Sequence, residues 1–98
     1  MAKFKFPKSM ESKPFWGNNE AITTAKLTIT GSGDDFEISL GLSDTYDGTY
    51  TYEAVSGFDA SQGTNSLSHT FTATGKWIKW KAVGLNYTVT KLEITPNT

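Results

Sequence analysis

Hydrophobic and polar residues alternate along most of the chain with a period of two. The clearest run covers residues 36–42, where Phe36, Ile38, Leu40 and Leu42 share one parity and polar or small residues occupy the other. This alternation is typical of a β-strand that buries one face. Similar runs predict further strands over residues 25–30, 49–55, 67–72, 76–83 and 87–94.

Glycine-rich and aspartate-rich segments separate these runs. We expect turns at residues 31–35, 43–48 and 84–86, because glycine tolerates positive φ and aspartate can hydrogen-bond its own backbone. Six to seven short strands without a credible helix predict an all-β fold. The predicted architecture is an antiparallel β-sandwich of jelly-roll or immunoglobulin-like type.

The last predicted strand changes its apolar parity. Val89 lies on one parity, whereas Leu92 and Ile94 lie on the other. An extra residue in one strand of a pair shifts the parity in this way, so we predict a β-bulge or a change of sheet near Thr90. The residues expected to be buried in the core are Phe36, Ile38, Leu40, Ile78, Trp80 and Leu92.

Residues 1–20 differ from the rest and are predicted to form an extended N-terminal arm, with the sandwich domain over residues 21–98. Pro7 and Pro14 favour extended backbone before them, yet the segment is too aromatic for a simple disordered tail. Two interpretations are open: residues 3–6 form a first strand that folds back onto the domain's own core, or the arm docks its aromatic residues on a neighbouring subunit. In the second case, the expected anchors are Phe4, Phe6, Phe15 and Trp16.

Composition limits the possible partners. The chain has 98 residues, enough for one domain, and its nine basic and ten acidic residues leave a net charge of −1. A general nucleic-acid binder needs an excess of cations, which is missing here. No apolar run approaches the roughly 20 residues of a membrane span. We therefore expect neither nucleic acid nor a membrane as a partner.

The residue types of the chain give little support for a catalytic site or a metal site. The chain has no cysteine and a single histidine, His69, which excludes thiolate zinc sites and sites with two imidazoles. His69 lies in the middle of a predicted strand and no Gly-x-Ser-x-Gly motif is present, so we interpret it as structural. Asp44 and Asp47 lack the spacing of a calcium loop and are interpreted as turn residues. We expect no enzymatic activity, no cofactor and no metal.

One predicted strand places large side chains outside the core. Trp77, Lys79 and Lys81 share the outward parity of residues 76–83 and are candidate partner-binding residues. They are suited to stacking on a sugar or to contacting a protein. In the alternative interpretation, Trp77 packs under a loop or the N-terminal segment, and the lysine stems cover apolar surface.

Three stretches of the chain stand out as a set: FEISLGLSDTYDGTYTYEAV at residues 36–55, HTFTATGKWIKWKAVGL at residues 69–85 and YTVTKLEI at residues 87–94. Together they resemble bacteriophage virion proteins. The first is similar to their strand–turn–strand pattern, in which a Ser/Asp/Gly turn precedes a Thr-aromatic pair. The second resembles their following strand pair and the third their closing strand. A short aromatic arm before a single module most resembles the small capsid decoration (cement) proteins.

The resemblance implies a non-enzymatic virion structural protein that stabilises the capsid. The implied partners are the major capsid protein and further copies of the same chain, with a trimer favoured. The implied location is the capsid surface, after synthesis in the cytoplasm of the bacterial host. Two other functions stay open: a phage tail, baseplate or fibre component, and a carbohydrate-binding β-sandwich module that uses Trp77 and nearby tyrosines.

Overall fold

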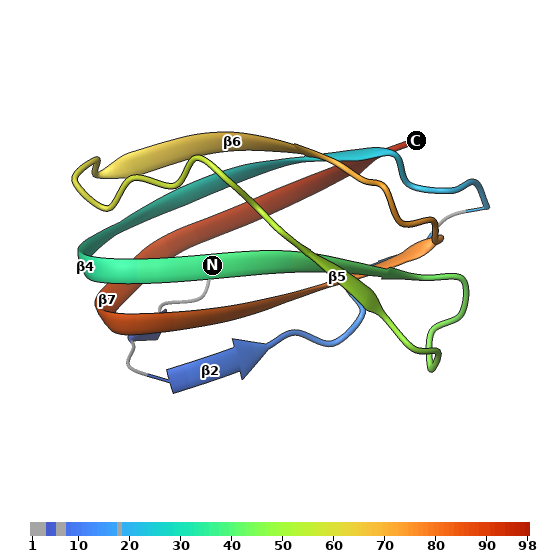
Figure 1. The fold of residues 1–98 in the computed structure, drawn as a ribbon, viewed down its shortest axis with the longest axis horizontal. Helices are drawn as coiled ribbons and strands as arrows, with labels where there is room; N and C mark the ends of the chain where they lie inside the picture. Colours follow the sequence, from blue (N-terminus) through green and yellow to red (C-terminus); the bar gives the residue numbers. More distant parts are fainter. Residues whose placement is uncertain (1–3, 6–7, 18) are drawn as a thin grey trace.

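A computed structural model describes residues 4–5, 8–17 and 19–98. Within them the chain forms seven strands and no helix, and every strand pairing is antiparallel (Figure 1). The predicted all-β antiparallel sandwich is confirmed. The strands are β1 (Phe4–Lys5), β2 (Lys8–Glu11), β3 (Trp16–Gly17), β4 (Thr24–Ser43), β5 (Thr51–Ala54), β6 (Thr64–Thr70) and β7 (Trp77–Asn97).

Two long strands, β4 and β7, organise the sandwich. They pair along their whole length, from Thr24 opposite Asn97 to Ser43 opposite Trp77. Both double back at the same end of the molecule (Figure 1), so each contributes one half to either sheet. The β6 sheet contains β6, residues 24–30 and residues 91–97. The β5 sheet contains β5, residues 36–43, residues 77–84, β2 and β3.

The predicted turns at residues 31–35 and 84–86 are wrong, because both segments remain inside continuous strands. The bend occurs in two paired strands at once, and the pairing of β4 with β7 resumes directly beyond it. Gly33 has a φ of 143°, and Asn86 on the opposite strand has a φ of 56°. Gly33 and Asn86 therefore adopt backbone conformations that bend the paired strands β4 and β7. From the sequence, the strands were expected to end at these segments.

The predicted bulge near Thr90 is confirmed. Thr30 pairs with Lys91 and the next residue, Gly31, pairs with Val89, so Thr90 has no opposite partner in the β4 register. The Thr90 hydroxyl donates a hydrogen bond of 3.2 Å to the Thr30 carbonyl. This extra residue explains why the apolar parity changes along β7.

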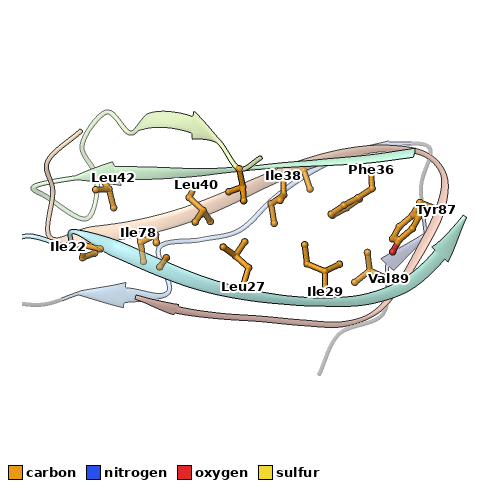
Figure 2. Close-up of a cluster of buried hydrophobic side chains, with 13 residues drawn as sticks. Ile22, Leu27, Ile29, Phe36, Ile38, Leu40, Leu42, Ile78, Tyr87 and Val89 are labelled. Atoms are coloured by element: carbon orange, nitrogen blue, oxygen red, sulfur yellow. The ribbon is translucent and has the colours of Figure 1, made fainter. Parts of the chain in front are cut away.

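The core lies between the two sheets. Phe36, Ile38, Leu40 and Leu42 point toward the other half of β4, which carries Leu27 and Ile29 (Figure 2). At the bend, the fully buried Tyr87 ring stacks on Phe36 with centroids 5.2 Å apart. Of the predicted core residues, Phe36, Ile38, Leu40 and Ile78 are buried, whereas Trp80 and Leu92 are half-buried and pack against the core.

One edge of the sandwich is closed by a carboxylate. Glu53 of β5 lies 2.8 Å from His69 Nε2 of β6, so this contact joins the two sheets. The Thr72 and Ala73 amides also donate to Glu53, the latter at 2.6 Å. His69 further meets the Phe71 ring edge-on at 4.8 Å. The only histidine of the chain thus takes part in a contact that holds the sheets together.

Glu53→Gln should lower the free energy of unfolding by about 1–3 kcal/mol, because the charged acceptor of several hydrogen bonds is lost. The Ala73 amide is the main cause that lowers the pKa of Glu53 below its ordinary 4.5. A lowered folded-state pKa contributes stability above pH 4.5, and this contribution is lost as the pH falls through the folded-state value. In urea unfolding between pH 3 and 7, the free energy of unfolding should therefore fall less steeply toward acid pH for the variant than for the wild type.

Glu93→Gln is the matched control for this prediction. Glu93 is exposed and its pair with Lys91, at 3.3 Å, lies on the surface. Such pairs contribute about 0–1 kcal/mol. Equal losses in the two variants would contradict a special role for Glu53.

The described part of the N-terminal segment lies on the chain's own β7. The Ser12 amide donates to the Trp80 carbonyl at 2.8 Å, and the Phe15 amide donates to the Ile78 carbonyl at 3.1 Å. Met10 and Trp16 pack against the core. Residues 8–17 therefore fold onto their own domain. The predicted strand over residues 3–6 lies only partly within the described residues, where Phe4–Lys5 pairs with β7. The described residues contain no helix long and apolar enough to cross a bilayer.

Candidate functional site

The outer surface of the β5 sheet gathers aromatic and charged side chains. Trp77, Lys79 and Lys81 alternate along β7 with the buried Ile78 and Ala82, so they project outward as predicted. Tyrosines from β5 and from the loop before it, together with a glutamate of β2, lie beside them. We call this surface the tyrosine–lysine face; its members are Glu11, Tyr46, Tyr50, Tyr52, Trp77, Lys79 and Lys81.

Lys79 occupies the centre of the tyrosine–lysine face. Its Nζ lies 2.6 Å from Glu11 Oε1 and 5.1 Å from the centroid of the Tyr50 ring. The hydrogen bond between Lys79 and Glu11 raises the pKa of the lysine and lowers the pKa of the glutamate. Burial raises the pKa of Tyr50, so its hydroxyl stays protonated at neutral pH. The centre of the face is therefore an ion pair beside a neutral phenol.

Lys81 and Tyr52 form the second contact of this kind. The Lys81 Nζ lies 4.1 Å from the centroid of the Tyr52 ring, a cation–π geometry. The Tyr52 ring covers Gly41 on the neighbouring strand, and a Cβ at Gly41 would lie 2.8 Å from the ring. A bare glycine on the central strand thus lets the tyrosine lie flat across the sheet toward the lysine.

Trp77 packs within the protein on two sides. A Cβ on Gly17, its partner in β3, would lie 2.6–2.7 Å from the indole ring, so the ring covers this glycine. Tyr46 of the preceding loop meets Trp77 in a T-shaped contact with centroids 5.2 Å apart. Trp77 therefore packs against a loop and the N-terminal segment, as in the second sequence interpretation. Tyr46, with 46% of its surface exposed, is the more accessible ring.

Two hollows lie along the tyrosine–lysine face. The larger, about 520 Å³, lies between residues 11–14 and residues 46–50, with Lys79 also in its lining. The smaller, about 350 Å³, is lined by Glu11, Lys81 and Val83 among others. Val83 is 45% exposed. One end of the face is thus polar and aromatic, and the other contains an exposed aliphatic side chain.

Among the predicted arm anchors whose side chains the structure describes, Phe15 and Trp16 do not share one site. Phe4 lies in β1, opposite Val89, and Phe6 lies outside the described residues. Trp16 packs against the core, and Phe15 is 40% exposed. Phe15 lines a third hollow, of about 240 Å³, with Trp80, Leu92 and Ile94.

The sequence predicts outward positions for Trp77, Lys79 and Lys81, and the sugar-binding alternative expects tyrosines near Trp77. It does not identify the neighbours, which are Glu11, Tyr46, Tyr50 and Tyr52. The alternation of residues 49–55 puts Tyr50 and Tyr52 on one parity, which is the signal that was available. Their neighbours depend on the pairing of β5 with β4 and of β2 with β7, which links distant segments. In the described part of the chain, no three histidine or acidic side chains lie close enough together to hold a metal ion.

Comparisons with known proteins give no relative for this chain: no family model, no curated protein and no solved structure matches it.

Proposed function

We propose that the protein is a non-enzymatic virion structural protein, a phage head decoration protein that docks its tyrosine–lysine face on the major capsid protein. The observation that carries the proposal is the contact of Lys79 with Tyr50 and of Lys81 with Tyr52 on one face of the β5 sheet, where Tyr46 also packs on Trp77. Tyrosine, tryptophan and cations with long apolar stems suit protein interfaces. The resemblance of residues 36–55 and 69–94 to virion proteins supplies the biological setting.

Stabilisation of a shell needs no chemistry at this face. A protein that binds the assembled shell, and not its free subunits, shifts assembly toward the shell by mass action. The segment 8–17 is hydrogen-bonded to β7, so we place the main contact on the sheet face. The end near Lys81 and the exposed Val83 is the expected centre of contact, because it joins a charge to an apolar side chain.

Co-sedimentation with undecorated phage heads tests this proposal. Lys81→Glu should weaken binding about tenfold or more, because it reverses a charge at the centre of the contact and removes the stem over Tyr52. Lys26→Glu is the matched control, since Lys26 is exposed on the β6 sheet. The control should bind like the wild type. Failure of the wild-type protein to sediment with heads, or equal binding by both variants, would refute the proposal.

A further inference from the structure

We propose that the larger hollow of the tyrosine–lysine face is a binding site for a neutral oligosaccharide. This inference goes beyond a structural role in a shell and rests on other residues than the Lys81 end. The hollow lies between residues 11–14 of the N-terminal segment and residues 46–50 of the loop before β5. Its volume of about 520 Å³ is within the range of small-molecule sites, about 300–1,000 Å³.

The charges around the hollow favour an uncharged ligand. Lys13 and Lys79 supply two positive charges, and Glu11 and Asp47 supply two negative charges. Lys79 and Glu11 are also paired with each other at 2.6 Å. The acidic side chains would repel a polyanion, and the lysines would repel a polycation. A neutral ligand rich in hydroxyl groups avoids both repulsions, and each of its hydroxyls can both donate and accept hydrogen bonds.

The paired groups match the hydroxyl pattern of a sugar. The Lys79 ammonium only donates hydrogen bonds and the Glu11 carboxylate only accepts them. Because the two groups are adjacent, they can satisfy two neighbouring hydroxyls of one sugar ring in opposite senses. Asp47 offers a further acceptor from the loop side. Hydrogen bonds to such charged groups are stronger than those between neutral groups.

An aromatic surface for the apolar face of a sugar ring is also present. Tyr46 lines the hollow and is 46% exposed, and its contact with Trp77 holds it from the side. A tyrosine ring offers rigid apolar area at low conformational cost, together with a polar hydroxyl. Tyr50 lines the hollow as well. The site thus combines stacking surface with convergent polar groups.

The loop that carries these tyrosines is held before any ligand arrives. The Tyr50 hydroxyl donates to the Tyr46 carbonyl at 2.9 Å. The Thr45 amide donates to Ser43 Oγ at 3.2 Å, and the Gly48 amide donates to the Thr45 carbonyl at 3.2 Å. A site ordered in advance loses less entropy on binding.

The test is an NMR titration of the full ¹⁵N-labelled chain with five neutral hexasaccharides: cello-, malto-, xylo-, manno- and chitohexaose. At least one should bind at about millimolar concentration. It should shift the amides of residues 11–13, 46–50 and 79 and leave those of residues 26–30 in place. Binding by none of the five sugars, or shifts centred away from the hollow, would overturn the proposal.

Variants connect the binding to named groups. Tyr46→Ala should weaken binding at least about tenfold, whereas Tyr46→Phe keeps the ring and should bind nearly as the wild type. Lys81→Glu should retain sugar binding, since Lys81 does not line this hollow. This last variant separates the two proposals, because Lys81→Glu is expected to lose binding to phage heads and to keep binding the sugar. Unchanged affinity in Tyr46→Ala would contradict the site.

Discussion

Ile38→Ala should lower the free energy of unfolding by about 2–5 kcal/mol. Ile38 is 3% exposed and points from the β5 sheet into the core shared with the β6 sheet (Figure 2). Truncation removes buried methyl groups and leaves a cavity, since both neighbouring strands are held by their ladders. Denaturation in guanidinium chloride, followed by tryptophan fluorescence, measures the loss.

Glu37→Ala is the control beside it. Glu37 is exposed on the outer side of the same strand, so its truncation should change the stability by about 0.5 kcal/mol or less. A larger loss in Glu37→Ala than in Ile38→Ala would mean that the facing of β4 is inverted.

Gly33→Ala should cost about 2–4 kcal/mol for a different reason. Gly33 has a φ of 143°, which L side chains rarely adopt. An added Cβ would also clash with the Asn86 carbonyl oxygen on the paired strand. Both problems involve backbone, so no side chain can move aside to relieve them. The bend of the ribbon should be the part that yields.

Gly63→Ala provides the matched substitution. A Cβ at Gly63 would meet nothing within 4 Å, and its φ is not positive. This variant should be as stable as the wild type or slightly more so, because alanine reduces the entropy of the unfolded chain. Thermal unfolding of the two glycine variants in parallel tests the prediction; similar melting temperatures would contradict it.

The sequence predicts those parts of the fold that depend on one strand alone. The alternation of residues 36–42 places Phe36, Ile38 and Leu40 inside, because a strand that covers a core must show its apolar side chains every second residue. The parity change near Thr90 likewise predicts the bulge that the β4–β7 register contains. In both cases the packing constraint can be recognised in the residue pattern of one short stretch.

The path of the chain between strands is less accessible to this reasoning. Residues 31–35 have the composition of a turn, yet β4 continues through them because β7 bends alongside. The composition of this segment indicates that the backbone bends here. It does not indicate that the paired strand β7 bends at the same place. Trp80 and Leu92 are half-buried for a related reason: both line a surface hollow with Phe15, and parity does not show which inward positions remain open to solvent.

The same distinction applies to the candidate site: features of a single strand are predictable from the sequence, and contacts between paired strands are not. Outward parity predicts the exposure of Trp77, Lys79 and Lys81 on β7. The ring of Tyr52 reaches Lys81 across Gly41, and Glu11 reaches Lys79 from a segment 68 residues away in the chain. Such neighbours follow from strand pairing between distant segments. A single sequence contains no direct signal for that pairing.

The full-length pairing of β4 with β7 has a consequence for the speed of folding. The two strands meet only after the chain between them has closed into a large loop; Thr30 and Thr90, which are hydrogen-bonded, are 60 residues apart. Loop closure costs entropy before the contacts that reward it can form. Proteins dominated by such distant contacts reach their native state in milliseconds to seconds, far more slowly than helical bundles. We therefore expect the pairing of β4 with β7, which shapes both sheets, also to make this small domain fold slowly.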